Sequence, residues 1–324
     1  MEMETTEDGA QHPPLTNAGM DPRITEVERA ALSAWPAAHV QELDGWKLRF
    51  HWNMTGRANS VWPNEVTGSR SLEQRLDQVA HFYHGWLLPA RYQVSPASCP
   101  PELDEVLDAR GYRFQQGASV QIQSIDALLS RAYADAGDAL RAGDRVVPLA
   151  DRAGGSDCLP TPADRISNDR LSAHPGDGGI PELTIQVLTR PDDAWFSVQK
   201  AALALEPKWA GLRRSLIQEI AVRSANDASA GFALCRANGE PAAIAIGVLM
   251  GNWLGIFGMA TAPRFRRCGA AIRSLRGLAD WAEGRVSTVY LQVFQENRPA
   301  LALYEKLGFE ELYAYHYRVE PWPS

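Results

Sequence analysis

The residues best suited to chemistry stand close together in one segment, Gly258 to Ala271, which reads GMATAPRFRRCGAA. A strand-like run ends at Pro263, an arginine-rich turn follows, and a helical pattern begins near Gly269. Backbone N–H groups at the start of a helix, the helix dipole and guanidinium groups together bind phosphate or pyrophosphate. Glycine at 269 would let the backbone approach such an anion, because it has no Cβ. The alternative is a plain turn with surface arginines; a Walker loop is excluded, because no Gly-Lys-Ser/Thr follows.

A second segment, LQVFQENRPALALYEKLGF, offers an amide and a phenol. Asn297 follows a strand-like run and precedes a helical pattern that contains Tyr304 and stops at a Gly-Phe pair. Taken alone, Tyr304 is more simply interpreted as an aromatic side chain on a buried helix face, beside Leu301 and Leu307.

These two segments resemble the acyl-CoA-binding motifs of the GNAT acetyltransferase superfamily. Its first motif reads Gln/Arg-x-x-Gly-x-Gly/Ala, and Arg266 to Ala271 gives Arg-Arg-Cys-Gly-Ala-Ala. Its second motif is a strand, an Asn, a helix with a Tyr, and Gly-Phe; here Tyr304 follows Asn297 by the usual seven residues. The motifs stand in the superfamily's order, which makes the resemblance stronger than either motif alone.

The resemblance implies a role for each of these residues. The strand at 259–261 would separate from residues 291–294, and its free backbone groups would bind the pantetheine arm and acetyl carbonyl of acetyl-CoA. Residues 267–272 would hold the pyrophosphate, Asn297 would contact the cofactor arm, and Tyr304 would protonate the departing thiolate. The implied cofactor-binding residues are Met259, Ala260, Thr261, Arg266, Arg267, Cys268, Gly269, Ala270, Ala271, Ile272, Asn297 and Tyr304.

Two positions depart from the commoner residues of the motif. Ala271 stands where Gly is commoner, and Cys268 stands where relatives often have Arg or Gln, which removes one phosphate contact. A thiol near the cofactor sulfur would be reactive, but a small buried side chain is the simpler interpretation of Cys268.

The general base that would take a proton from an attacking amine is not evident. Such a group is usually a carboxylate, a His or a water chain. His316 and Glu206 are the candidates, and Gln292 stands where some GNAT relatives have a catalytic Glu. His316 lies in the strand-like run YAYHY, where alternation puts three tyrosines on one face and His316 on the other.

The elements that must position these residues form two α/β blocks. In the first block the pattern predicts a helix from 24, strands at 45–52 and 57–63, and a helix capped by Ser71. A strand at 91–95, a helix that ends at Gly111 and a strand at 118–125 are predicted to follow. The second predicts a strand at 183–189, helices at 192–206 and 211–223, a hairpin around Asn238-Gly239, a strand at 254–261, a helix at 270–284, a strand at 286–294, a helix at 297–309 and a strand at 312–320.

The first block also resembles half of a GNAT protein. It lacks the Arg-rich Gly turn after RYQVS, while its DEVLDARGYRF echoes YEKLGFEEL of the second block. The resemblance implies an α/β (α+β) GNAT fold of two tandem GNAT-like domains, each a mixed, mostly antiparallel sheet flanked by helices, with a degenerate N-terminal half. We expect a flexible tail at 1–22, the degenerate domain at 23–135, a partly disordered linker or insert at 136–181 and the acyl-CoA-binding catalytic domain at 182–324.

Composition excludes several classes of protein. The chain has 324 residues, and no run approaches the roughly 20 apolar residues that span a bilayer. The N-terminus has neither the basic start nor the apolar core of a signal peptide, so we expect a cytoplasmic protein. No metal site is expected: His81 and His84 have no partner ligand nearby in the sequence, and the four cysteines are too far apart for a disulfide framework or a zinc site. Those cysteines are Cys99, Cys158, Cys235 and Cys268.

Positive charge is local rather than general. The formal net charge is -7, which argues against a general nucleic-acid binder. Five arginines nevertheless fall together without an acidic residue among them, and they suit a compact anion. They are Arg264, Arg266, Arg267, Arg273 and Arg276.

The resemblance implies an acetyl-CoA-dependent N-acetyltransferase acting on a primary amine of a small molecule or amino acid, with acetyl-CoA as donor substrate and Tyr304 as general acid. Two alternatives stay open: a transferase of the same fold that uses an aminoacyl-tRNA donor, and a non-catalytic acyl-CoA sensor. The expected partner is the amine acceptor, with no membrane and no nucleic acid other than tRNA as donor. We expect a monomer that is a pseudo-dimer of its halves; a homodimer is the alternative.

Overall fold

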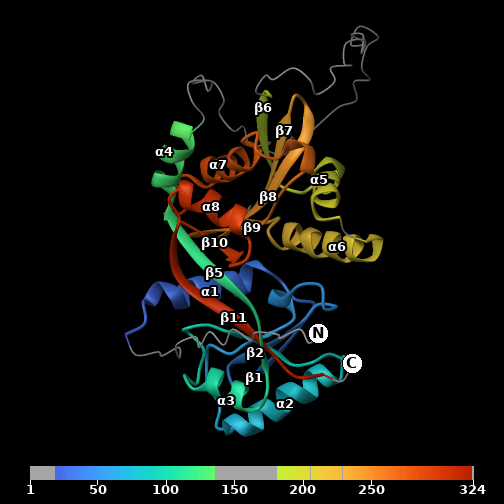
Figure 1. Cartoon of the computed structure of the whole chain (residues 1–324), viewed down its shortest axis with the longest axis vertical. Helices are drawn as coiled ribbons and strands as arrows, with labels where there is room; N and C mark the ends of the chain where they lie inside the picture. The colour runs from blue at the N-terminus through green and yellow to red at the C-terminus, as the bar shows by residue number, and fades with distance from the viewer. Residues whose placement is uncertain (1–18, 136–180, 205, 228, 323–324) are drawn as a thin grey trace, which may run out of the picture.

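One sheet of eleven strands runs through the computed structural model, which describes residues 19–135, 181–204, 206–227 and 229–322 (Figure 1). The strands are β1 (His39–Leu43), β2 (Trp46–Phe50), β3 (Val61–Trp62), β4 (Arg91–Val94), β5 (Arg113–Ser124), β6 (Leu183–Leu188), β7 (Ala230–Ala237), β8 (Glu240–Met250), β9 (Trp253–Thr261), β10 (Thr288–Phe294) and β11 (Glu310–Val319). Their order across the sheet is β1-β2-β3-β4-β11-β5-β10-β9-β8-β7-β6. Only β3–β4 and β9–β10 pair in parallel, so the expected mixed, mostly antiparallel sheet is confirmed.

Helices cover both faces of this sheet. They are α1 (Pro22–Ala34), α2 (Leu72–His84), α3 (Leu103–Ala109), α4 (Ile125–Asp135), α5 (Asp193–Leu203), α6 (Pro207–Arg223), α7 (Ala270–Ala282) and α8 (Arg298–Lys306), with 3₁₀ turns η1 (Gly56–Ala58) and η3 (Pro263–Phe265). Residues of α1, α5 and α6 share one apolar core, and residues of α4, α7 and α8 share a second. Tyr290 and Leu291, neighbours on β10, belong to the first and second core respectively, as strand alternation requires. None of the described helices is both long and apolar enough to cross a bilayer.

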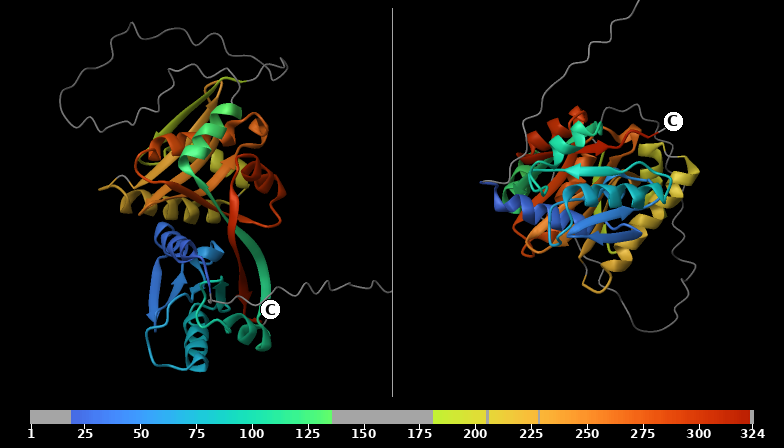
Figure 2. Two further views of the ribbon diagram at one scale, coloured as in Figure 1. Left: turned by 90° about the vertical axis from the view of Figure 1, so that its left-hand side faces the viewer. Right: turned by 90° about the horizontal axis from the view of Figure 1, so that it is seen from below.

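The two halves of the chain exchange their last strands. β5 ends the first half, yet its residues 118–124 pair with β10; β11 ends the second half, yet it pairs with β4. β5 and β11 also pair with each other and connect the two parts of the molecule (Figure 2). Each follows a short helix and a glycine in the left-handed region, Gly111 or Gly308, both with φ 79°. This repeated helix–glycine–strand unit explains the echo between the two sequence blocks.

One strand and one helix, β1 and α4, were not predicted from the sequence, and the strand predicted at 57–63 is instead the end of the 3₁₀ turn η1 followed by the two-residue β3. Four of the five residues of β1 are exposed, so the strand lacks the apolar alternation that indicates a buried face. α4 begins at Ile125, directly after β5, and packs against α7. The domain bounds at 23–135 and 182–324 stay predictions. Most of the expected tail and nearly all of the expected insert, residues 1–18 and 136–180, lie outside the described residues.

Candidate functional site

β9 and β10 are paired along only part of their length. Their parallel register ends where Ile256 lies opposite Leu291. Beyond this point β9 continues against β8 with a bulge, in which Gly258 and Met259 together oppose Ala245. Gly258 has φ 56°, a conformation that glycine adopts without strain. Because a bulge bends its strand, β9 leaves β10 here, and its backbone groups face a gap rather than a partner strand.

The turn predicted to hold pyrophosphate follows β9 directly. Gly269 precedes α7 with φ 87°, and a Cβ added there would meet only Leu183 Cδ1, at 3.6 Å. Arg267 also adopts the left-handed region, with φ 65°. The first turn of α7 contains no acidic residue that would repel an anion. Open space above a helix N-terminus is the geometry that an anion needs.

The five clustered arginines separate into two groups. Arg266 and Arg267 are exposed at the turn and form no ion pair with a described residue. Arg264 forms an ion pair with β8, and its guanidinium lies 4.6 Å from the ring of Phe265. The remaining two, Arg273 and Arg276, are buried in α7. Two arginines, rather than five, therefore lie exposed at the turn without an ion pair to a described residue.

The other motif residues around this turn are mostly packed. The thiol of Cys268 donates a hydrogen bond to the carbonyl of Phe265 at 2.9 Å and packs beside the buried Ala270. Ala271 and Ile272 are half-buried in the first turn of α7. The remaining two, Ala260 and Thr261, are half-buried on β9 and pair with β8.

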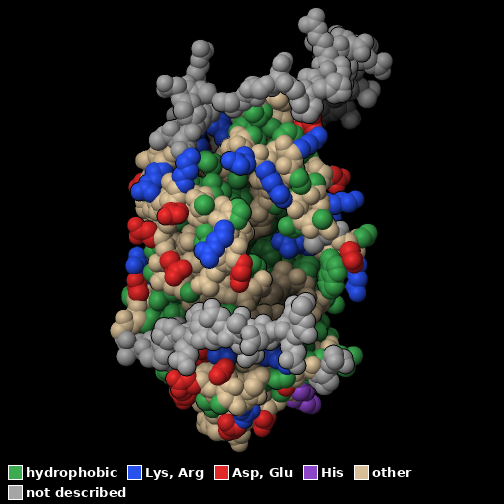
Figure 3. All heavy atoms as spheres, viewed as in Figure 1, with side chains coloured by type: hydrophobic (Ala, Val, Ile, Leu, Met, Phe, Trp, Pro, Cys, Tyr) green, Lys and Arg blue, Asp and Glu red, His purple; other side chains and the backbone are tan. Residues whose placement is uncertain are grey.

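A cleft of about 450 Å³ opens where β9 and β10 separate. Its walls are formed by both halves of the chain: Trp35, Met54, Thr55, Gly56, Arg57, Gln116, Arg213, Ile256, Phe257, Gly258, Met259, Leu291, Gln292, Val293, Phe294, Asn297, Tyr304, Tyr315 and Tyr317. Figure 3 shows the surface hollowed at the level where α6 and β9 face α1 and β11 in the same view of Figure 1. Hydrophobic side chains cover its walls, and Lys or Arg side chains stand at its edge. Of the predicted residues, the cleft brings together Met259, Asn297 and Tyr304.

Asn297 and Tyr304 form the wall contributed by α8. The Asn297 side chain caps this helix by accepting a hydrogen bond from the backbone N–H of Ala300 at 3.3 Å. Tyr304 is 7% exposed, and its ring packs edge-on against Phe309 with centroids 5.7 Å apart. Burial raises the pKa of Tyr304 to about 12, so the phenol keeps its proton at neutral pH. A protonated phenol on the wall of a cleft can act as a general acid.

The opposite wall carries two arginines that sequence analysis did not single out. The guanidinium of Arg57, from η1, lies 5.6 Å from the ring centroid of Trp35 and 5.2 Å from that of Phe257. Arg213 comes from α6. The Nε atoms of both arginines are buried and have no hydrogen-bond partner among the described residues. No motif marks these arginines, because the fold brings them together from segments far apart in the sequence.

The described residues that line the cleft include no Asp, Glu, His or Lys. Gln292 accepts a hydrogen bond from the Tyr315 hydroxyl at 3.4 Å, and its buried Nε2 has no partner among the described residues. The described residues also contain no group of three His, Cys, Asp or Glu side chains that could hold a metal ion. The ionisable side chains among these described lining residues are therefore Arg57, Arg213, Tyr304, Tyr315 and Tyr317.

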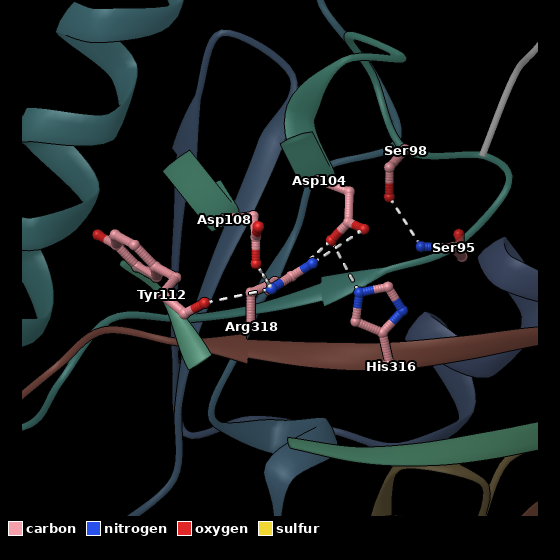
Figure 4. A network of polar contacts seen from close by, with 7 residues as sticks. All are labelled: Ser95, Ser98, Asp104, Asp108, Tyr112, His316 and Arg318. Atoms are coloured by element: carbon pink, nitrogen blue, oxygen red, sulfur yellow. Dashed lines mark hydrogen bonds and ion pairs between the residues drawn. The ribbon is translucent and has the colours of Figure 1, made fainter. Parts of the chain in front are cut away.

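The two predicted bases do not line the cleft. His316 Nε2 lies 2.8 Å from Asp104 Oδ1, and Arg318 Nε donates to the same oxygen at 2.7 Å (Figure 4). The imidazole of His316 also stacks on Phe114. Glu206 is exposed before α6, and its side chain does not cap that helix. The neighbouring tyrosines of β11 point to the other face and are buried, as predicted: Tyr313, Tyr315 and Tyr317.

Known proteins resemble the chain in both halves. Residues 197–309 match the acetyltransferase (GNAT) family, and residues 22–105 match the family described as probable histone acetyltransferase Rv0428c C-terminal. The chain is 24% identical over 300 residues to the uncharacterized N-acetyltransferase YobR of Bacillus subtilis (strain 168), a match that covers 92% of this chain and 98% of YobR.

Two solved structures share its fold. One is a GCN5-related N-acetyltransferase from Kribbella flavida, with a TM-score of 0.56, 14% identity and coverage of 92% of this chain and 95% of that one. The other is a tandem GNAT protein from the clavulanic acid biosynthesis pathway, with a TM-score of 0.50, 14% identity and coverage of 80% and 73%. These two likenesses concern the fold alone.

Proposed function

We propose that this chain, a GNAT-superfamily acyltransferase, transfers the acetyl group of acetyl-CoA to a primary amine of a small molecule or amino acid. The observation that carries this proposal is the cleft between the separated strands β9 and β10. On its wall stands the protonated phenol of Tyr304, and β9 leads directly into the glycine turn before α7.

The donor fits the residues on this side of the cleft. Backbone groups of β9 beyond Ile256 have no partner strand toward β10, so they suit the amides of a pantetheine arm. The N-terminus of α7, with Gly269 and the exposed Arg266 and Arg267, suits a pyrophosphate. These residues favour acetyl-CoA over an aminoacyl-tRNA as acyl donor, because a tRNA would need a longer positively charged surface.

In the proposed reaction the neutral amine attacks the carbonyl carbon of the thioester. A C–N bond forms, the C–S bond breaks, and Tyr304 gives its phenolic proton to the departing thiolate. The amine proton leaves to water, because the described cleft residues contain no carboxylate or imidazole, and a proton from water restores the phenol of Tyr304. The chain's main contribution is to hold donor and acceptor in line and to supply backbone donors to the developing oxyanion.

An assay of CoA release tests this proposal. Purified protein, acetyl-CoA and a panel of primary amines should release free thiol in an amine-dependent way, with an N-acetylated product identified by mass spectrometry. If acetyl-CoA binds and no amine raises thiol release above slow hydrolysis, the transferase proposal is wrong and the chain is an acyl-CoA sensor.

A further inference from the structure

The cleft connects the two faces of the sheet. Met259 and Tyr304 belong to the core beneath α7 and α8, whereas Trp35 and Phe257 belong to the core beneath α1, α5 and α6. The turn at Gly269 lies at the N-terminus of α7, so it belongs to the face of the sheet that α7 and α8 cover. A donor held by that turn therefore reaches the cleft from the α7–α8 face. The α1–α6 face of the cleft is then left for the amine, because the donor occupies the α7–α8 side.

The wall on the amine's side is positively charged. Arg57 and Arg213 are the only ionisable groups other than tyrosines among the described residues that line the cleft. Neither forms an ion pair with a described residue, and the buried Nε of each has no hydrogen-bond partner there. Burial lowers the pKa of Arg213, and the charge of Arg57 lowers it further, so the two cations repel each other. A bound anion would offset both the repulsion and the loss of hydration.

We infer that the acceptor is an amino carboxylate, whose carboxylate is bound by Arg57 and Arg213 on the face of the sheet opposite Tyr304. This inference rests on the proposed function and names its substrate class. Planar guanidinium groups match a carboxylate with paired hydrogen bonds, and the unpartnered Nε2 of Gln292 is a further donor on the cleft wall. The rings around Arg57 suit an apolar side chain on the acceptor. Uncharged amines and polyamines would leave two cations unpaired.

Pairs of acceptors that differ only in the carboxylate test the inference. Each apolar L-amino acid, such as leucine, methionine or phenylalanine, is compared with its amide in acetyl transfer from acetyl-CoA. The amide has the less basic amine, so more of it is neutral at neutral pH. A preference for the acid therefore cannot come from the protonation state of the amine. We expect kcat/KM for the acid to exceed that for the amide by about 10- to 100-fold, the range for a hydrogen bond to a charged group.

The variant Arg213→Gln should remove most of that preference. Its kcat/KM for the amino acid should fall about 10- to 100-fold, while its kcat/KM for the amide changes little. Arg213→Lys should keep part of the preference for the acid, because lysine retains the positive charge but cannot form the paired hydrogen bonds of a guanidinium group. The matched control is Arg214→Gln, the next residue of α6, whose guanidinium pairs with Asp193 and stacks on Phe196. That control should keep the wild-type preference.

Arg57→Gln gives a second, independent test, and thermal unfolding shows whether each variant is folded. A folded Arg213→Gln protein that loses acid and amide transfer equally would overturn the inference, because a merely structural role predicts equal loss. Equal wild-type rates for acids and amides, or transfer to uncharged amines alone, would also overturn it and leave the proposed function standing. Failure to bind acetyl-CoA would instead overturn the proposed function itself.

Discussion

Tyr304 has the position and the protonation state that its proposed role as general acid needs. It stands on the wall of the cleft, and burial raises its pKa to about 12, so the proton is retained throughout the physiological range. Sequence alone favours packing as its role, and the structure gives it both roles, since the ring packs on Phe309 while the residue lines the cleft. The ring and the hydroxyl can therefore be tested separately.

Replacing Tyr304 by Phe should keep the packing and remove the acid. We expect kcat to fall roughly 100-fold, the lower end of the range for a lost proton donor, with little change in acetyl-CoA affinity. Steady-state kinetics and calorimetry measure the two quantities. Tyr290→Phe is the control, because it removes a fully buried phenol that does not line the cleft. Equal activity of wild type and Tyr304→Phe would contradict the role of general acid.

Asp104 gives a prediction about stability and pH. Burial alone would raise its pKa above the usual 3.8, but hydrogen bonds from His316 and Arg318 outweigh burial and lower it. Because the folded-state pKa lies below the unfolded one, this carboxylate contributes stability above about pH 4 and loses it as the pH falls through the folded-state pKa. Asp104→Asn should lower the free energy of unfolding by about 2 kcal/mol at neutral pH. The difference from wild type should shrink as the medium becomes more acidic.

Urea denaturation across the acidic range measures this difference. Asp77→Asn is the control, because its carboxylate is 79% exposed and lies 3.9 Å from Arg110. A gap between wild type and Asp104→Asn that stays constant with pH would show that the carboxylate's charge is not what stabilises this network.

At the scale of elements, local signals in the sequence predicted most of the fold. Ser71 caps α2, Asp192 caps α5, and the Asn238-Gly239 turn has positive φ at both residues, so each boundary is fixed by its own residues. The separation of β9 and β10 was expected from the family resemblance, and the bulge at Gly258 supplies its local cause. Neither Arg57 nor Arg213 belongs to a helix cap, a turn motif or any other local sequence signal of this kind. The fold brings them to one cleft wall from η1 and α6, and no spacing in the sequence encodes that placement.

The capping box of α2 allows a direct test of whether local residues fix the start of a helix. Ser71 accepts a hydrogen bond from the backbone N–H of Gln74, whose side chain accepts from the backbone N–H of Ser71. Ser71→Ala should lower the free energy of unfolding by about 1 kcal/mol. Ser215→Ala, in the exposed middle of α6, should change it by less than about 0.5 kcal/mol. Equal effects in chemical denaturation would contradict the capping role.

At the scale of the whole molecule, the exchange of β5 and β11 makes each half depend on the other. β5 lies between β10 and β11, so the C-terminal part without it would leave two strand edges unpaired. The two halves also share the cleft, because η1 and the end of α1 line it together with α6 and β9. The sequence echo predicted two related halves, but pairing between distant strands is not visible in local patterns.

Splitting the chain tests this dependence. Fragments 1–150 and 151–324, expressed together, should purify as one complex, because β5 of the first must insert between β10 and β11 of the second. Fragment 151–324 expressed alone should aggregate or fail to fold cooperatively. A monomeric fragment 151–324 with cooperative unfolding would contradict the dependence.

Calorimetric titration with acetyl-CoA tests the central claim, that the turn at Gly269 holds the donor. Gly269→Glu places a bulky anion at the N-terminus of α7, and it should weaken binding by at least about 100-fold, because the new carboxylate occupies the site that the dipole offers to an anion and repels the ligand's pyrophosphate. Gly284→Glu is the matched control: it lies just beyond the other end of α7, has φ 73°, and has no atom within 4 Å of an added Cβ, so it carries similar backbone strain. Tight binding by wild type and Gly284→Glu, lost in Gly269→Glu, is the result we predict. Absence of binding by folded wild type, or equal binding by all three proteins, would contradict the account.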